Sequence, residues 1–331
     1  LPCAHMYGLM FEVLYELSVG CHVHFLSRLP SPKIIMQALA EVKPNIVIAV
    51  PLVIEKIYKS KVKPILEKEG IKFLMKVPGL DQIVLNKVKT ELINAFGGEF
   101  YEVIIGGAAF NKEVEAFFKR MGFPFTVGYG MTECGPLISV TEHFDEFKPS
   151  SCGRYLKEMI DVRIDSSDPQ RIPGEILVRG EHVMMGYYKN EEATTNVLEP
   201  DGWMHTGDMG TMDPDGTLYI RGRSKTMILS SNGQNIYPEE IEDKLNNLPL
   251  VMESLVVERK NVLTALIFPD YDQAKQEGID AEALDKMMAE NIANLNKMVA
   301  SYEKVGRYEL MQSEFEKTPK RSIKRYLYQD R

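Results

Sequence analysis

The sequence predicts an α/β protein: the C-terminal part of a large α/β domain with a small β-rich subdomain, followed by a small α+β domain. Two observations carry this prediction. Strand-like and helical segments alternate in the first part of the chain, and short strands punctuated by glycine, proline and aspartate begin near Asp161. The 331 residues suit about two domains.

The first part of the chain, residues 1–222, contains two helices and two buried strands by pattern. Residues 32–42 carry apolar side chains at helical spacing, with Ser31 as the N-cap. Residues 45–50 (NIVIAV) and 102–105 (EVII) are short runs rich in β-branched residues, which is typical of buried strands. Residues 111–121 form an amphipathic helix that Gly122 closes.

The large domain, residues 1–222, ends with a β-rich subdomain over about residues 155–222. Strands are expected at 161–164, 175–179 and 217–221, and the run DPDGTLYI predicts a hairpin turn that enters the last one. A loop, SSNGQN at 230–235, then precedes a helix at 238–248, strands at 254–258 and 264–268, and a helix at about 281–299. We place the domain boundary near 223–226, which makes residues 223–331 the small domain.

Composition excludes several classes of protein. The net charge of −8 argues against non-specific nucleic-acid binding, although a local basic patch remains compatible with it. Four cysteines without a CxxC pair indicate a reducing cytoplasm. The longest apolar run, NIVIAVPLVI, is too short to span a bilayer. The chain opens with Leu1 inside an apolar pattern, so we expect it to be a fragment.

Other residues favour structural roles. His22 and His24 alternate on an expected strand, and no further metal ligands follow at suitable spacing, so strand packing is the preferred interpretation over a metal site. Methionines such as Met287 and Met288 are expected to fill a core.

Three glycine-containing motifs are candidates for a nucleotide site. In FTVGYGMTECGP, glycines flank Tyr129, whose ring could face a base, and Thr132 and Glu133 suit phosphate oxygens and Mg²⁺; the alternative is an ordinary strand-to-loop turn. A second motif, Gly106-Gly107-Ala108, follows a strand, and α/β proteins bind ligands at such strand ends. The alternative is a tight turn that needs small residues.

In the third motif, WMHTGDMG, a carboxylate could accept the hydroxyls of a ribose. The alternative is an ordinary aspartate in a β-turn. The motif contains Asp208 directly after a glycine. The cationic run RGRSK at 221–225 follows at the expected domain boundary, where ligand sites and hinges concentrate, although charge runs are usually solvated.

Taken together, these strings resemble the adenylate-forming superfamily, which includes acyl-CoA synthetases, peptide-synthetase adenylation domains and firefly-type luciferases. LPCAHMYG, IIGGAA, VGYGMTE, GEILVRGEHVMMGYY, DGWMHTGDMG, YIRGRSKTMI and SSNGQNIYPEEIE occur in the order of that family. The resemblance covers essentially the whole chain. VPLVIEKIY and the closing FEKTPKRSIKR look most like long-chain fatty acid–CoA ligases, which are AMP-binding acyl-CoA synthetases.

The resemblance implies a role for each matching residue. Gly106, Gly107 and Ala108 would line the adenine pocket, with Tyr129 stacking and Gly130 beside it. Thr132 would contact the α-phosphate, Glu133 would hold Mg²⁺, and His5 would abut the carboxylate of the fatty acid. Asp208 and Arg223 would bind the ribose, Lys225 would be the hinge between the domains, and Gly233 would lie in the loop that lines the coenzyme A tunnel.

Two departures from the family pattern matter. The glycine-, serine- and threonine-rich phosphate loop is absent, which implies that about the first two fifths of the protein is missing. The late catalytic lysine aligns with Ser322, and Lys320 and Lys324 lie two residues to either side. Either a neighbouring lysine substitutes, or adenylation is impaired, because a serine cannot supply the positive charge.

The implied reaction joins a carboxylate to the α-phosphate of ATP to give acyl-AMP and pyrophosphate, after which the thiol of coenzyme A displaces AMP and takes the acyl group. Transfer to a carrier protein and non-catalytic nucleotide or acyl binding are the alternatives. We expect this fragment alone to be inactive. The sequence leaves the acyl chain length and the oligomeric state open; peripheral membrane contact also stays open, since no basic amphipathic helix requires it.

Overall fold

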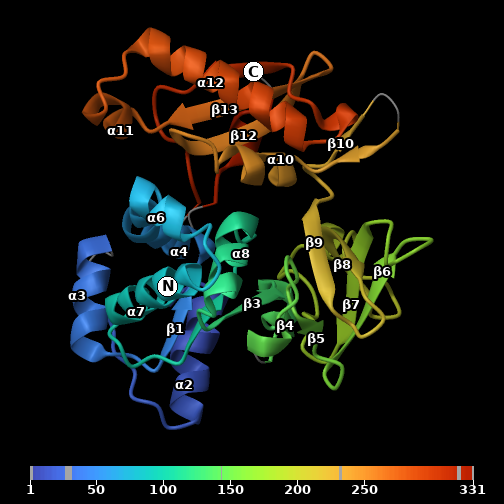
Figure 1. Cartoon of the computed structure of the whole chain (residues 1–331). Coiled ribbons are helices and arrows are strands. Elements are labelled where there is room, and N and C mark those ends of the chain that lie inside the picture. The colour runs from blue at the N-terminus through green and yellow to red at the C-terminus, as the bar shows by residue number, and fades with distance from the viewer. Residues whose placement is uncertain (1–2, 27–31, 143, 231–232, 319–321, 330–331) are drawn as a thin grey trace. The chain divides into compact units, whose positions relative to one another are not determined.

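A computed structural model describes residues 3–26, 32–142, 144–230, 233–318 and 322–329. The chain divides into two compact units (Figure 1). Unit 1 comprises Leu1–Arg163, Leu177–His205 and Met212–Tyr219, and unit 2 comprises Ile164–Ile176, Thr206–Thr211 and Ile220–Arg331. The domain boundary expected near residue 223 stays a prediction.

Unit 1 is built on a five-stranded sheet of order β1-β2-β3-β4-β5. β1, β2 and β3 are parallel, and β4 and β5 continue the sheet antiparallel. The strands are β1 (Ile46–Ala49), β2 (Glu102–Ile105), β3 (Phe125–Gly130), β4 (Leu137–Val140) and β5 (Arg154–Tyr155). The two strands expected in the first part of the chain are therefore confirmed as β1 and β2, because their β-branched side chains suit a sheet covered by helices.

Helices and two short π turns make up most of the remainder of unit 1. They are α1 (Met6–Leu9), the π turn Met10–Leu14, α2 (Tyr15–Ser18), α3 (Pro32–Val42), α4 (Pro51–Ile57), the π turn Tyr58–Val62, α5 (Lys63–Leu66), α6 (Glu69–Leu74), α7 (Leu80–Ala95), α8 (Lys112–Met121) and α9 (Glu191–Thr195). The Asn111 side chain caps α8 by accepting two backbone N–H groups, and Gly122 ends the helix in the left-handed conformation. The helices expected at 32–42 and 111–121 are confirmed, while the expected cap Ser31 lies outside the described residues.

The expectation of a strand around His22 and His24 is wrong. The segment has no regular structure, and the two imidazole rings stack with centroids 4.3 Å apart. Alternating polar and apolar residues favour a strand only where a sheet edge is available to pair with them, and no described strand pairs with this segment.

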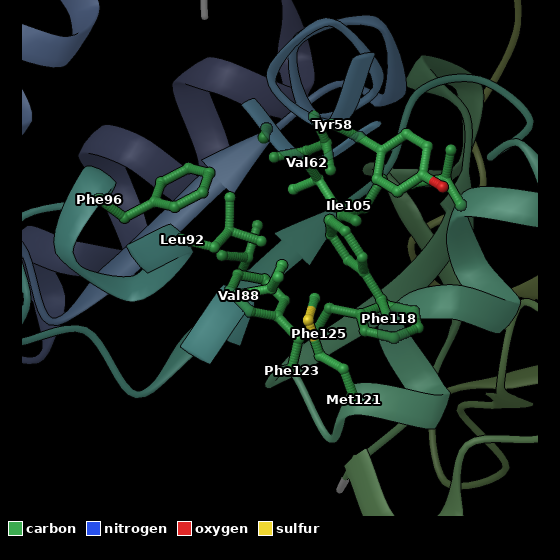
Figure 2. Packing of buried hydrophobic residues seen from close by; sticks show 14 of the residues in the cluster. Tyr58, Val62, Val88, Leu92, Phe96, Ile105, Phe118, Met121, Phe123 and Phe125 are labelled. Carbon is green, nitrogen blue, oxygen red and sulfur yellow. The ribbon is translucent and has the colours of Figure 1, made fainter. Parts of the chain in front are cut away.

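Aromatic rings dominate the core of unit 1 (Figure 2). Phe118, Phe123 and Phe125 are fully buried, and the ring centroids of Phe118 and Phe123 lie 4.7 Å apart. Val88 and Leu92 on one face of α7 pack into the same cluster. Full burial of each such side chain contributes about 1.5–3 kcal/mol, which holds the sheet and its helices as one scaffold beneath the strand ends.

A four-stranded sheet of order β6-β7-β8-β9 follows in the chain. Its strands are β6 (Ile160–Asp165), β7 (Gly174–Gly180), β8 (Met204–Met212) and β9 (Leu218–Arg223). The hairpin turn expected in DPDGTLYI is confirmed, because the Asp213 N–H donates to the Thr217 carbonyl at 2.9 Å and the Gly216 N–H donates to the Asp213 carbonyl at 2.9 Å. All three strands expected in this region are present.

The C-terminal part of unit 2 is a three-stranded sheet covered by helices. Its elements are β10 (Ile228–Leu229), β11 (Asn235–Ile236), α10 (Pro238–Leu245), β12 (Val251–Arg259), β13 (Val262–Pro269), α11 (Tyr271–Gln276), α12 (Ala281–Met298) and β14 (Arg307–Leu310). The sheet order is β12-β13-β14. The helix expected at 238–248 ends at Leu245, and Met288 is fully buried, as expected of a core residue.

Buried ion pairs fasten the last described residues to the rest of unit 2. The guanidinium of Arg325 donates to both carboxylate oxygens of Glu242 at 2.8 and 2.7 Å, and Lys317 pairs with Glu253. Removing one partner of a buried pair leaves an uncompensated charge and costs about 3–5 kcal/mol, so these pairs hold the segment in one place. Among the described residues, no helix is long and apolar enough to cross a bilayer.

Candidate nucleotide site

The turn after β2 is shaped by the absence of a side chain at Gly106. Gly106 is buried, and a Cβ placed there would lie 3.1 Å from the ring of Tyr7. Tyr7 in turn donates from its hydroxyl to the Ile104 carbonyl at 3.3 Å. Gly107 has φ +84°, a left-handed conformation that favours glycine, and it is exposed together with Ala108. At Gly107 and Ala108 the turn thus presents open backbone, which a flat ligand can approach.

The turn after β3 carries Thr132 and Glu133. At Gly130 a Cβ would lie 1.9 Å from the Pro136 carbonyl oxygen, so only glycine fits where the chain folds back. A single 3₁₀ turn, Thr132–Cys134, follows. Thr132 is exposed and Glu133 is half-buried, so a hydroxyl and a carboxylate stand next to each other on a short, hydrogen-bonded turn.

Two groups from the segment before α9 hold Glu133. The Tyr187 hydroxyl donates to the Glu133 carboxylate at 3.0 Å, and the Met184 N–H donates to the Glu133 carbonyl at 2.8 Å. Burial, together with the neighbouring carboxylate, raises the pKa of Tyr187 above its ordinary value, so the hydroxyl remains a donor. Sequence reasoning missed this tyrosine; the only signal was its place in the string MMGYY.

The topology of the sheet brings these two turns together. β2 and β3 are parallel neighbours, and both turns follow the carboxyl ends of their strands, so both lie at the same edge of the sheet. His5 lies next to Tyr7, whose ring packs against Gly106. His5 caps α1, and its Nδ1 accepts the Tyr7 N–H at 3.2 Å. Tyr7 itself was not predicted as a site residue. Unit 1 therefore gathers His5 and every residue expected at the adenine and phosphate positions.

Asp208 and Arg223 form an ion pair within unit 2. The Nε of Arg223 lies 2.7 Å from Oδ1 of Asp208, whose side chain is 5% exposed, whereas the Arg223 side chain is 55% exposed. The Thr206 hydroxyl accepts the Asp208 N–H at 3.1 Å and donates to the Ile176 carbonyl at 2.7 Å. A buried carboxylate on a strand, paired with a flexible cation, is a fixed acceptor for hydroxyl groups.

Lys225 and Gly233 lie in open segments of unit 2. Lys225 is exposed in the turn that follows β9. The residues on either side of it are held by the backbone: the Ser224 N–H donates to the Gly207 carbonyl, and the Thr226 N–H donates to the Arg223 carbonyl. Gly233 has φ +75°, and apart from its chain neighbours no atom of the described residues lies within 4 Å of where its Cβ would be. It belongs to the connection between the paired strands β10 and β11. Both positions leave room for motion or for a ligand.

The position expected for the catalytic lysine lies in a short loop that is closed at its base. The Thr318 N–H donates to the Ser322 carbonyl at 2.8 Å, and the Lys324 N–H donates to the Glu316 carbonyl at 2.8 Å. The Lys324 ammonium pairs with Glu316 at 3.3 Å, while Lys320 lies outside the described residues. Ser322 therefore occupies the position where the family pattern has its lysine. The Lys324 ammonium, two residues later, is paired with the Glu316 carboxylate.

The residues present fit a magnesium ion that arrives with a nucleotide. No cluster of three or more histidine, cysteine or acidic side chains that could hold a metal occurs in the part of the chain that the structure describes. Mg²⁺ usually binds through one or two carboxylates together with substrate phosphates, and Glu133 is such a single carboxylate beside the Thr132 hydroxyl.

Comparison with known proteins agrees with this reading of the motifs. The model of the AMP-binding enzyme family matches residues 1–188, and the model of the AMP-binding enzyme C-terminal domain matches residues 225–330. A long-chain-fatty-acid–CoA ligase of Mycobacterium bovis is 31% identical over an alignment of 263 positions that covers 72% of this chain and 42% of the ligase. One of Gallus gallus is 30% identical over an alignment of 294 positions that covers 81% of this chain and 38% of that ligase. The chain spans less than half the length of these relatives.

Solved structures show the same fold. The o-succinylbenzoate coenzyme A synthetase of Bacillus subtilis, in complex with AMP, superposes with a TM-score of 0.73 at 22% identity, over 100% of this chain and 60% of the synthetase. ATP-bound MatB from Rhodopseudomonas palustris gives a TM-score of 0.72 at 22% identity, over 100% of this chain and 59% of MatB. With the family models covering most of its length, the chain belongs to the AMP-binding enzyme family, the adenylate-forming group that its motifs resemble.

Proposed function

We propose that the full-length protein is a fatty acid–CoA ligase. It would join a fatty acid carboxylate to the α-phosphate of ATP, giving acyl-AMP and pyrophosphate, and would then let the thiol of coenzyme A displace AMP to form a thioester. Family membership supports the acid–thiol ligase class. Preference for a long acyl chain is supported by the names of the mycobacterial and chicken relatives and by the VPLVIEKIY string.

The observation that carries this proposal is the pairing of the β2 and β3 turns at one sheet edge. In the proposed reaction Gly106, Gly107 and Ala108 admit the adenine, and the Tyr129 ring stacks on it. Thr132 donates its hydroxyl to an α-phosphate oxygen, and Glu133 holds Mg²⁺, which neutralises phosphate charge when bound. The chain's own contribution is to orient the phosphate and the attacking carboxylate, since positioning supplies most of the rate in phosphorus transfer.

The other expected roles complete the mechanism as proposals. Asp208 accepts the ribose hydroxyls while Arg223 holds its carboxylate, and His5 stands next to the fatty acid carboxylate. Residues 223–331 would act as a small mobile domain that turns about Lys225, and the loop with Gly233 would line the path of coenzyme A. We also propose a cytoplasmic location, because the cysteine pattern fits a reducing compartment.

Ser322 supports a second candidate, a protein that binds nucleotide or an acyl ligand without turnover. The loop position of the late lysine holds a serine, and the neighbouring Lys324 is paired with Glu316. Loss of a cation that stabilises a charged transition state costs about 10²–10³ in rate. A third candidate, an acyl-AMP ligase that feeds a carrier protein, shares the first half-reaction and differs only in the acceptor.

Product analysis by mass spectrometry separates these candidates. The full-length protein is given ATP, Mg²⁺, coenzyme A and a mixture of carboxylic acids of graded length. We expect acyl-CoA, with the longest acids preferred. Accumulation of acyl-AMP without acyl-CoA would instead favour the carrier-protein ligase, and binding of ATP without any product would establish the non-catalytic candidate. The 331-residue chain alone is expected to form no acyl-CoA, since it lacks the phosphate loop.

A further inference from the structure

One segment of unit 1 has a charge opposite to that of the rest of the chain. Residues 56–90 contain nine lysines and only three acidic residues, Glu67, Glu69 and Asp81, which gives a net charge of +6. The whole chain has a net charge of −8, so all other residues together have −14. We call residues 56–90 the basic segment; it runs from the end of α4 to the middle of α7.

The acidic residues near the α6–α7 connection are compensated by cations. Glu69 pairs with Lys72 at 2.8 Å, and Asp81 pairs with Arg120 of α8 at 3.0 Å. Lys68 and Lys76, which flank α6, are exposed. The surface around this connection is therefore cationic, and it attracts an anionic partner over about a Debye length of 8–10 Å.

Large apolar side chains are exposed at the same place. Phe73 on α6 is 68% exposed, and Leu80 and Ile83 in the first turn of α7 are 39% and 65% exposed. The connection between these helices is tight, because the Leu80 N–H donates to the Val77 carbonyl at 3.2 Å. α6 and α7 contact each other, so Phe73, Leu80 and Ile83 belong to two neighbouring helices that a short connection joins.

We infer that the α6–α7 connection is a docking surface for an anionic lipid bilayer. Lysines around exposed aromatic and aliphatic side chains are what a peripheral membrane site needs: the cations attract acidic headgroups, and the apolar groups enter the boundary with the acyl chains. A second copy of the chain that docked through the same surface would present the same cations and repel it. Nucleic acid would satisfy the lysines and leave Phe73, Leu80 and Ile83 without an apolar environment.

The test measures binding of the full-length protein to vesicles, without substrates, so its result does not depend on the proposed ligase activity. The vesicles are phosphatidylcholine alone or phosphatidylcholine with about 30% phosphatidylserine. We expect co-sedimentation with the acidic vesicles only, weakened as salt rises from about 0.1 to 0.5 M. Binding that is absent, or equal on both kinds of vesicle, would overturn the inference.

Matched variants locate the surface. The double variant Lys68→Glu/Lys76→Glu is expected to lower partitioning onto acidic vesicles by about tenfold or more. Lys275→Glu/Lys286→Glu, at exposed positions of α11 and α12, changes the net charge equally and is expected to bind as the unmodified protein does. Equal losses for the two double variants would show that only total charge matters, and would contradict a defined surface.

The apolar contribution is tested in the same way. Phe73→Ser should weaken binding several-fold, whereas Met298→Ser, at a side chain that is 48% exposed at the end of α12, should not. A single-stranded oligonucleotide serves as competitor. Displacement of the protein from vesicles at low oligonucleotide concentration, with no effect of Phe73→Ser, would assign the surface to nucleic acid instead.

Discussion

At the scale of single residues, the contact between Tyr187 and Glu133 fixes the orientation of the carboxylate that is expected to hold Mg²⁺. One carboxylate oxygen accepts the Tyr187 hydroxyl at 3.0 Å, and the backbone of Glu133 is held by Met184 at 2.8 Å. A carboxylate fixed in this way loses little rotational freedom when a metal–nucleotide complex arrives. Tyr187 is thus a positioning residue, because its hydroxyl acts through Glu133.

The variant Tyr187→Phe is expected to raise the Mg²⁺ concentration that half-saturates ATP binding by about tenfold, the value of one hydrogen bond to a charged group. Calorimetric titration of the full-length protein with ATP, at a series of Mg²⁺ concentrations, measures the Mg²⁺ requirement directly. Tyr188→Phe is the matched control, since Tyr188 is 88% exposed. Burial raises the pKa of Tyr187, so the effect should be constant from about pH 7 to 9. An unchanged Mg²⁺ requirement would show that the contact is only structural.

Residues such as Tyr7 and Tyr187 could not be found from the sequence. Tyr187 lies 54 positions from Glu133, and Tyr7 lies 97 positions from its partner Ile104. No local periodicity connects such distances. By contrast, Gly130 and Gly107 were recognisable, because close approach of backbone and positive φ restrict those positions to glycine.

At the scale of elements, the loop with Ser322 carries the main question about catalysis. The variant Ser322→Lys places an ammonium where the family pattern has one. If the loop approaches the α-phosphate, ATP–pyrophosphate exchange by the full-length protein should rise by about 10²–10³. Ser322→Gln is the control for side-chain length without charge. Equal rates for the two variants would show that this position does not act on the phosphate.

Local patterns predicted elements well where one face of a segment is buried. β2 has the expected bounds, and α8 begins one residue after its expected start and ends at the expected Gly122, because its apolar stripe and its closing glycine agree. The region from α4 to α7 was not assigned. α4, α5 and α6 are only four to seven residues long, and Pro78-Gly79 separates α6 from α7, so no long periodic stretch precedes α7.

At the scale of the whole molecule, the net charge of −8 gives no indication of the cationic surface that we propose for lipid docking. The lysines of the basic segment are spread over α4 to α7, the π turn between α4 and α5, and the ends of α6, so they form no single basic amphipathic helix. Lys68, Lys72 and Lys76 lie in or beside α6, which carries Phe73 and contacts α7. A fatty acid–CoA ligase held at a bilayer would meet its substrate where such acids partition, which links the docking surface to the proposed activity.

The last prediction concerns the exposed turn that contains Lys225. If the small domain turns about this residue between the half-reactions, a proline there should restrict the motion, because its ring holds φ near about −65°. Lys225→Pro in the full-length protein is expected to leave ATP–pyrophosphate exchange within about twofold and to lower thioester formation by about tenfold or more. Lys225→Ala removes the charge alone and should leave both rates unchanged. Equal loss of both rates in Lys225→Pro would indicate general damage to the fold, and so would contradict a hinge at this position.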